Sequence, residues 1–245
     1  MTHTLVLATD LDGTFLGGSD DMRERLYRTV EERRSELLLV FVTGRDLPFI
    51  RELCGSGSVP WPDYVIGDVG TSIASGADLS PMHSLEDDIA AAWADRGDEV
   101  RALLAGAPGL TLQPTPFRYR VSYDYDPAAF DASVIPRIEA AGFDVLISAN
   151  RFLDVLPPGI RKGPTLVRLI DHLGLDRESV LVAGDTLNDL SLFETGLQGV
   201  AVGNSEPALK QQLAERPTVY HSEGAGAAGI LEAIDHLNLL PEKVA

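Results

Sequence analysis

Short apolar runs alternate with longer, partly charged segments along most of the chain. Leu5–Thr9 is apolar and ends in an acidic turn, which is typical of a buried strand. Ser19–Glu36 is charged and helical in character, and Leu37–Val42 is wholly apolar. This alternation predicts a parallel sheet with helices on both faces. Further helices are expected at Leu47–Leu53, Lys162–Leu173, Leu187–Phe193, Glu206–Ala214 and Ala225–Leu237, and further strands at Tyr64–Ile66, Val180–Ala183, Gly199–Val202 and Thr218–His221.

Between about Pro81 and Pro157 the pattern changes. Strand-like segments come in pairs here, which favours an antiparallel sheet. We therefore expect an α/β fold in which residues 1–80 and 158–245 form a Rossmann-like parallel-sheet core and residues 81–157 form an inserted α+β domain. The elements expected in the insert are a long helix at Leu85–Leu104, a strand at Phe117–Asp124, a helix at Pro127–Ala141 and a hairpin of Val145–Ser148 with Phe152–Leu156.

Composition narrows the range of partners. The 245 residues are 44% hydrophobic, enough for a packed core, and carry a formal net charge of −17. Such an acidic chain repels phosphate backbones and anionic lipid, so we expect neither nucleic acid nor a membrane as a partner. Cys54 is the only cysteine, which excludes an internal disulfide. The apolar runs are too short to span a bilayer and the first residues lack the basic region of a signal peptide, so we expect a cytoplasmic protein.

Two aspartates directly follow the first predicted strand. Asp10 and Asp12, in the segment Asp-Leu-Asp-Gly-Thr, are expected on the same side of the chain, and Gly13 allows a sharp turn. Two crowded carboxylates are costly unless a cation or a shared proton relieves their repulsion. Because Asp and Gly are also ordinary turn residues, a turn without a catalytic role is the alternative.

Two further segments suit a phosphate group. Thr43-Gly44-Arg45 follows a buried strand, at the end where ligands gather in parallel sheets, and a Thr hydroxyl with backbone N–H groups can bind phosphate oxygens. A simple helix N-cap is the alternative for this Thr. Lys162, one of three lysines in the chain, lies at the start of a predicted helix, where a solvated cation is the alternative.

A fourth segment, from Gly184 to Asp189, follows another buried strand. It adds two acids, Asp185 and Asp189, and the amide of Asn188 to the same edge of the predicted sheet. Four carboxylates at one sheet edge favour a hard cation, and Mg²⁺ bound by a few carboxylates and a phosphate fits this arrangement.

Together these four motifs, in this order, resemble the haloacid dehalogenase superfamily of phosphohydrolases, and the resemblance covers essentially the whole chain. The insert before Lys162 resembles the superfamily's C2-type cap domain. Softer features are similar to the sucrose-phosphate phosphatase group, although Arg120 and Ser72 replace the Lys and the acidic residue that are frequent there. These features are Pro62–Ile66, Val69-Gly70-Thr71, Arg120–Tyr123 and Leu153–Pro157 leading into Arg161-Lys162-Gly163.

The resemblance implies roles for the motif residues. Asp10 would be the nucleophile and form an aspartyl-phosphate, while Asp12 would protonate the leaving alcohol and then activate water. Mg²⁺ would be bound by Asp10, Asp185 and the main-chain carbonyl of Asp12. Asp189 would support this site without binding the metal. The phosphoryl oxygens would be held by Thr43, Gly44, Lys162 and Asn188.

Other functions could use the same residues. A phosphotransferase or phosphomutase would need the same site. A phospho-accepting receiver-type signalling domain also has acids, a Thr and a Lys at a sheet edge, but it needs neither Asp12 nor a large insert. A non-catalytic binding module would not need both Asp10 and Asp12. As a phosphomonoesterase, the protein would act on a small-molecule sugar phosphate, a disaccharide or hexose phosphate, as a monomer or weak homo-oligomer.

Substrate choice is expected to depend on the insert. Residues alternate along Phe117–Asp124, so its aromatic residues would face the helices of the insert while Arg118, Arg120 and Ser122 face the catalytic edge. The alternative is that both arginines are solvated surface residues. The nearby hairpin would add Ser148, Asn150 and Arg151 to the substrate-facing side.

A glycine-rich segment near the end of the sequence matches a known nucleotide-binding pattern. Gly224–Gly229 has the glycine spacing of a dinucleotide-binding loop. Only 16 residues follow Gly229, too few for the next strand and its ribose-binding acid. We therefore expect an ordinary loop that leads into the last helix.

Overall fold

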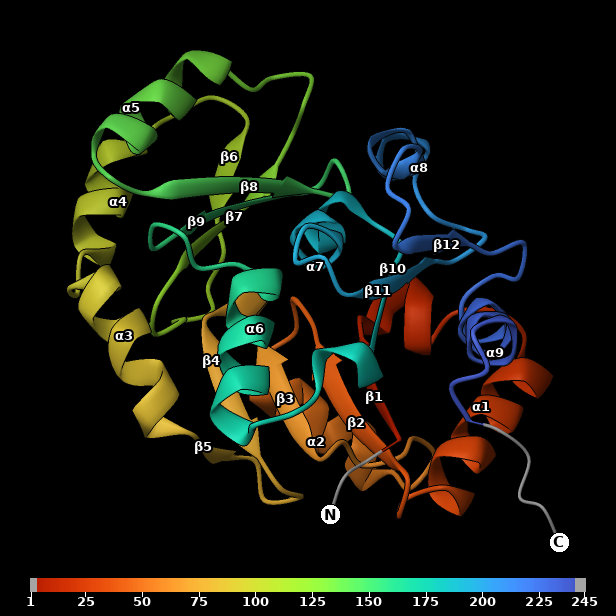
Figure 1. Cartoon of the computed structure of the whole chain (residues 1–245). Coiled ribbons are helices and arrows are strands. Elements are labelled where there is room, and N and C mark those ends of the chain that lie inside the picture. Colours follow the sequence, from red (N-terminus) through yellow and green to blue (C-terminus); the bar gives the residue numbers. More distant parts are fainter. Residues whose placement is uncertain (1–3, 241–245) are drawn as a thin grey trace, which may run out of the picture.

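A computed structural model of the chain describes residues 4–240 and contains two sheets (Figure 1). The first and last few residues of the predicted core therefore lie outside the described range. The larger sheet has the strand order β12-β11-β10-β1-β2-β3-β4-β5, and the smaller has the order β6-β7-β9-β8. The strands of the larger sheet are β1 (Leu5–Thr9), β2 (Leu37–Val42), β3 (Tyr64–Gly67), β4 (Ser72–Ser75), β5 (Ser80–Pro81), β10 (Val180–Gly184), β11 (Gln198–Ala201) and β12 (Val219–His221).

β1 lies inside the larger sheet and is buried on both faces. It pairs in parallel with β2 on one side and β10 on the other. Its alternate residues enter different cores, Leu5 and Leu7 on one face and Val6 and Ala8 on the other. A strand buried on both faces has no polar side, which explains why it appears in the sequence as a continuous apolar run. The predicted α/β fold with a parallel-sheet core is confirmed.

Helices cover both faces of the larger sheet. One core includes buried residues of α1, α2 and α9, and the other includes buried residues of α6, α7 and α8. None of the helices within residues 4–240 is both long and apolar enough to cross a membrane. The helices of the first face are α1 (Asp20–Glu32), α2 (Leu47–Gly55) and α9 (Ala227–His236), and those of the second are α6 (Lys162–Leu173), α7 (Leu190–Phe193) and α8 (Pro207–Leu213).

The smaller sheet has a core of its own. Val121, Tyr123 and Val155 pack on one face of this sheet with residues of the nearby helices, including Trp93 and Ile138. All of its strands fall within the segment 81–157, although the division of the chain into core and insert stays a prediction. These strands are β6 (Leu110–Leu112), β7 (Val121–Tyr125), β8 (Asp144–Ser148) and β9 (Phe152–Leu156), and the accompanying helices are α3 (His83–Trp93), α4 (Gly97–Leu103) and α5 (Ile135–Ala140).

The expected helix Leu85–Leu104 is wrong, because the structure has two helices there. The chain breaks between α3 and α4, where Ala94 and Asp95 have left-handed backbone angles (φ +52° and +55°). The break lies close to a change in packing. Ile89 of α3 lies in the core of the larger sheet, whereas Trp93 at the end of α3 and Val100 of α4 lie in the core of the smaller one.

The strand expected at Phe117–Asp124 is shorter than predicted. β7 begins only at Val121, and Phe117 turns back so that its ring lies 3.6 Å from the guanidinium carbon of Arg120. The helix expected at Pro127–Ala141 is likewise reduced to a short turn and α5, because Pro136 has no N–H to donate and fits only the first turn of a helix. The antiparallel strands β4 and β5 at one end of the larger sheet, and the short β6, are not predicted from the sequence.

A buried arginine connects the two sheets. Arg120, whose side chain is 6% exposed, donates to Asp154 of β9 at 2.7 Å, and it also donates to the main-chain oxygen of Gly44 at 3.2 Å and to Asp68 at 3.3 Å. The last two partners belong to the loops after β2 and β3. Burial raises the pKa of Asp68, although Arg120 acts in the opposite direction. Arg120 is therefore the cation shared by carboxylates from both sheets.

Replacing Arg120 should destabilise the fold. Arg120→Met leaves Asp154 and Asp68 without their cation, and breaking a buried ion pair in this way costs about 3–5 kcal/mol. The free energy of unfolding in urea measures this loss. Arg151→Met is a matched control, because Arg151 is exposed and stacks on Phe152. Equal, small changes in both variants would contradict the structural role of Arg120.

Candidate active site

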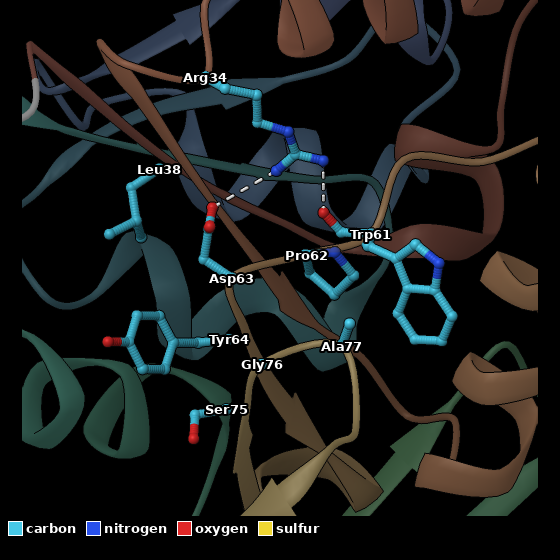
Figure 2. Close-up of a pocket in the computed structure, with 9 residues that line it drawn as sticks. All are labelled: Arg34, Leu38, Trp61, Pro62, Asp63, Tyr64, Ser75, Gly76 and Ala77. Atoms are coloured by element: carbon cyan, nitrogen blue, oxygen red, sulfur yellow. Dashed lines mark hydrogen bonds and ion pairs between the residues drawn. The ribbon is translucent and has the colours of Figure 1, made fainter.

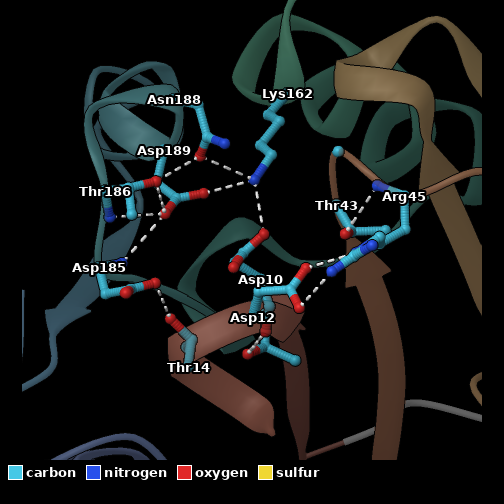
Figure 3. Close-up of polar contacts among 12 residues, drawn as sticks. Asp10, Asp12, Thr14, Thr43, Arg45, Lys162, Asp185, Thr186, Asn188 and Asp189 are labelled. Carbon is cyan, nitrogen blue, oxygen red and sulfur yellow. Dashed lines mark hydrogen bonds and ion pairs between the residues drawn. The ribbon is translucent and has the colours of Figure 1, made fainter. Parts of the chain in front are cut away.

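The motif residues lie together at one edge of the larger sheet (Figure 3). Asp10 follows β1, Thr43 follows β2 and Asp185 follows β10, and these are neighbouring parallel strands. Lys162 is the first residue of α6 and reaches the same edge. The carboxyl ends of parallel strands are the usual ligand-binding edge of such a sheet.

The loop Asp10–Thr14 carries the predicted nucleophile. This nucleophile loop leaves β1 in a tight turn. The Asp10 N–H donates to the carbonyl of Ala183 at 2.9 Å, which extends the pairing of β1 with β10 by one residue. Gly13 has φ +81°, and a Cβ atom at this position would lie 2.2 Å from Oδ2 of Asp185. Glycine is therefore required here both by the backbone angle and by the close approach of Asp185.

Lys162 is fully buried among acidic partners. Its Nζ lies 2.6 Å from Asp10 Oδ1, 2.6 Å from Asp189 Oδ1 and 3.1 Å from Asn188 Oδ1. Burial works against the charge of Lys162, but the two carboxylates outweigh it and raise the lysine pKa. Burial also raises the pKa of Asp10 well above its usual range, even though Lys162 acts in the opposite direction. The alternative of a solvated cation for Lys162 is therefore wrong.

Asp185 is the second buried acid at the edge. Its Oδ1 accepts from the hydroxyl of Thr14 at 2.7 Å. Burial raises the pKa of Asp185 to about 7, and the charge of Asp189 adds to the effect. Asp189 is used differently, because its Oδ2 accepts from the backbone N–H groups of Asp185 and Thr186 while its Oδ1 accepts from Lys162.

The acids at this edge fit a hard divalent cation. Carboxylate oxygens of Asp10, Asp185 and Asp189 lie within 4.8 Å of one another. If all three were ionised, their charge would exceed the single positive charge of Lys162 by two in a buried place, and a divalent cation would offset that excess. Asp189 accepts hydrogen bonds from Lys162 and from two backbone N–H groups, so Asp10 and Asp185 are the side chains better able to offer oxygen to a cation. All-oxygen ligand sets of this kind suit Mg²⁺.

Asp12 lies apart from this cluster. Its carboxylate is about half exposed and forms a two-bond ion pair with Arg45, with Nε to Oδ2 at 2.7 Å and Nη2 to Oδ1 at 3.0 Å. β1 ends at Thr9, so Asp10 and Asp12 follow the strand and are not part of it. The sequence motif includes Arg45 but does not predict its pairing with Asp12.

The remaining phosphate-site candidates face the same edge. Thr43 is buried, and its hydroxyl accepts from the N–H of Arg45 at 3.1 Å. The Gly44 carbonyl accepts from Arg120. Asn188 uses its Oδ1 to accept from Lys162 and from the hydroxyl of Thr186 at 2.8 Å. Their roles toward a phosphate stay predictions.

The candidate residues of the insert differ in burial and in their hydrogen-bond partners. Ser122 and Arg120 share Asp154 as a buried partner, so Arg120 is not a solvated surface residue and its charge is already matched within the protein. Arg118 lies outside β7, is 46% exposed and donates to Glu86 at 2.7 Å. Ser148, the last residue of β8, is buried, whereas Asn150 and Arg151, on the turn before β9, are exposed.

A pocket of about 510 Å³ lies away from this edge (Figure 2). It lies where β2 and β3 begin, beside Leu38, Tyr64 and Ser75, whereas the motif residues follow the ends of the strands. Its arginine, Arg34, is already bound, to the main-chain oxygen of Trp61 at 2.6 Å and to Asp63 at 3.5 Å. This pocket contains none of the predicted site residues.

A smaller pocket of about 190 Å³ adjoins the sheet edge that carries the motif residues. Its lining includes Asn188 and Leu190 of the larger unit together with Leu146 of β8 and Arg161. The smaller sheet therefore reaches the immediate surroundings of Asn188.

Comparison with known proteins gives consistent results. The family model for sucrose-6F-phosphate phosphohydrolase matches residues 3–238. A glucosylglycerol-phosphate synthase of Pseudomonas anguilliseptica is 43% identical over 96% of this chain, but the chain spans only 31% of that protein's length. A mannosylfructose-phosphate phosphatase of Agrobacterium fabrum is 28% identical, and the match covers 96% of this chain and 98% of that protein.

Among solved structures, the sucrose-phosphatase of Synechocystis sp. PCC6803, in complex with sucrose and phosphate, is similar over nearly the whole molecule. The TM-score is 0.89 at 29% identity, and the match covers 98% of this chain and 100% of that one. These findings agree with the predicted phosphohydrolase and give no support to a receiver-type signalling domain. The chain belongs to the sucrose-6F-phosphate phosphohydrolase family, within the haloacid dehalogenase superfamily.

Proposed function

We propose that the protein is a Mg²⁺-dependent phosphomonoesterase that hydrolyses a sugar phosphate through an aspartyl-phosphate. The observation that carries this proposal is the buried cluster in which Lys162 holds Asp10 at 2.6 Å, with Asp185 beside it. A carboxylate held in this way at the edge of a parallel sheet is oriented for attack on a phosphorus atom. Membership of a phosphohydrolase family supports the same reading.

In this proposal Asp10 is the nucleophile. An oxygen of Asp10 forms a bond to phosphorus while the bond from phosphorus to the sugar oxygen breaks, and water then attacks phosphorus and releases phosphate and free Asp10. Lys162, Thr43 and Asn188 hold the phosphoryl oxygens during both displacements. A bound Mg²⁺, held by Asp10, Asp185 and the carbonyl of Asp12, supplies positive charge that offsets the phosphate and the excess acidity of the site.

Asp12 is proposed as the general acid and base. It gives a proton to the leaving sugar oxygen and later takes one from the attacking water. Its carboxylate is about half exposed and is not tied to Lys162, so it can reach both the leaving group and solvent. Arg45, which forms two hydrogen bonds with it, fixes its direction.

The proposed substrate is a disaccharide or hexose phosphate, and the insert at residues 81–157 is proposed to act as a cap that selects it. The names of the relatives include sucrose, mannosylfructose and glucosylglycerol phosphates, which favours a phosphorylated glycoside. The candidates for contact with the sugar are Arg118 and the exposed Asn150 and Arg151. Phosphomutase or phosphotransferase activity is the second candidate, since it would use the same residues.

The first test is release of inorganic phosphate from a panel of phosphorylated hexoses, sucrose phosphate, mannosylfructose phosphate and glucosylglycerol phosphate. At least one glycoside phosphate should be turned over, and Asp10→Asn should abolish the activity because an amide cannot accept the phosphoryl group. The far-ultraviolet circular dichroism of the variant should match that of the wild type. Substantial activity in a folded Asp10→Asn protein would overturn the assignment of the nucleophile.

Asp12→Asn should still bind the sugar phosphate but should turn it over slowly. A general acid or base contributes about 10²–10⁴-fold to a rate, and the amide can neither give nor take the proton. Steady-state kinetics on the best substrate of the panel should show the loss in kcat. Asp46→Asn, a change on the neighbouring loop that removes a negative charge but keeps the side-chain oxygen that caps α2, is the control and should keep most of its kcat. A near-normal kcat in Asp12→Asn would argue against its role.

Removal of metal should stop turnover. Excess chelator should abolish phosphate release and added Mg²⁺ should restore it, whereas Ca²⁺ should be a poor substitute because its larger and looser ligand shell misplaces the reacting groups. Phosphate release with metal content checked by elemental analysis measures this. Full activity in a protein shown to be free of metal would remove the cation from the proposal.

A further inference from the structure

A loop that contains none of the predicted motifs lies against the segments that carry Asp10 and Asp185. It runs from Gly203 to Glu206, after β11, and several of its groups contact the loop that carries Asp185. The N–H of Glu206 donates to the carbonyl of Asp185 at 2.8 Å, and its carboxylate accepts from the N–H of Leu187 at 3.0 Å. The hydroxyl of Ser205 donates to the Gly184 carbonyl at 3.4 Å. The loop is thus fastened along the segment that carries Asp185.

Asn204 in this loop connects three segments that are distant in the sequence. Its Nδ2 donates to the carbonyl of Gly13, in the nucleophile loop, at 3.0 Å, and lies 3.5 Å from Oδ2 of Asp185. Its Oδ1 accepts from the N–H of Gly226 at 2.8 Å. The Asn204 side chain therefore directs its N–H groups to the loops that carry Asp10 and Asp185, and its oxygen accepts from the glycine-rich segment.

The glycine-rich segment has a structural use at this place. Gly226 has φ +53°, and a Cβ atom there would lie 2.2 Å from the carbonyl carbon of Gly17. The N–H of Ala227 donates to the Gly17 carbonyl at 3.1 Å. The spacing of glycines that resembles a dinucleotide-binding loop thus allows the backbone before α9 to pack closely on the backbone that follows the nucleophile loop.

Both oxygens of Asp185 are directed by these neighbours. Oδ1 accepts from Thr14 of the nucleophile loop at 2.7 Å, and Oδ2 lies against Gly13 and the amide of Asn204. Groups that orient a metal-binding carboxylate typically change metal affinity about 10–100-fold when they are removed. Because Asn204 contacts both the nucleophile loop and Asp185, it influences how Asp10 and Asp185 are placed relative to each other.

We propose that Asn204 is a positioning residue for the divalent-cation site, which holds the nucleophile loop and Asp185 at the separation that the cation needs. This inference rests on the proposed function, because it assumes that Asp10 and Asp185 bind the cation. It assigns no contact between Asn204 and substrate.

A matched control exists in the same loop. The Nζ of Lys210 donates to the carbonyl of Gly203 at 2.6 Å, one residue before Asn204. Lys210 thus fastens the loop without contacting Gly13 or Asp185. If Asn204 only stabilised the loop, Lys210→Met would have the same effect as Asn204→Ala.

The test is calorimetric titration of Mg²⁺ into the whole protein without substrate, for the wild type, Asn204→Ala, the milder Asn204→Ser and Lys210→Met. Asn204→Ala should weaken Mg²⁺ binding about 10-fold, Asn204→Ser should do so by less, and Lys210→Met should leave it unchanged. In turnover assays the Mg²⁺ concentration for half-maximal rate should rise by the same factor, while kcat at saturating Mg²⁺ stays within a few-fold of the wild type.

The outcomes separate this inference from the proposed function. If the wild type binds Mg²⁺ and both Asn204 variants bind it equally well, the positioning role is overturned and the proposed function stands. Equal weakening in Lys210→Met would also overturn it, in favour of general loop stabilisation. A wild type that binds no divalent cation would overturn both. If Asn204→Ala does not fold, the Asn204→Ser titration decides alone.

Discussion

The salt bridges of Lys162 are the interaction on which the rest of the structure depends. Its ammonium group is completely buried, and its two carboxylate partners, Asp10 and Asp189, are nearly so. A buried charge that loses its partner destabilises a protein by several kcal/mol, so removal of any one of these three charges should destabilise the folded protein. Because they lie at the end of β1, after β10 and at the start of α6, the cluster fixes three distant segments at one edge. The carboxylates of this edge outnumber Lys162, and their uncompensated negative charge favours a cation there.

The two sheets meet through charged and polar groups. The smaller sheet turns its apolar face, with Val121 and Tyr123, to its own helices, and turns Ser122 and Asp154 toward Arg120 and the loops of the larger sheet. Each unit therefore has its own core. The contact between the units is also partly apolar, because Ile89 of α3 lies in the core of the larger sheet.

The motif spacing and the apolar runs were sufficient to predict the centre of the fold. β1, β2 and β10 are buried on both faces, so apart from Thr9 their sequences contain no polar side chains and stand out clearly. Parallel pairing then brings the residues that follow them to one edge. The insert was harder to predict because its strands are short, and because the break at Ala94 is decided by which core each helix contacts.

The sequence by itself determined the fold class, the sheet edge at which the motif residues meet, and the identity of Asp10, Lys162, Asp185 and Asp189 as charged residues of that edge, because local hydrophobicity and short motifs carry that information. Only the tertiary structure decided which partner each polar group has. Asp12 pairs with Arg45, Arg120 with Asp154, and Asn204 with a carbonyl 191 residues away. Such pairings depend on how closely distant backbones pack, and no local pattern of residues records that distance.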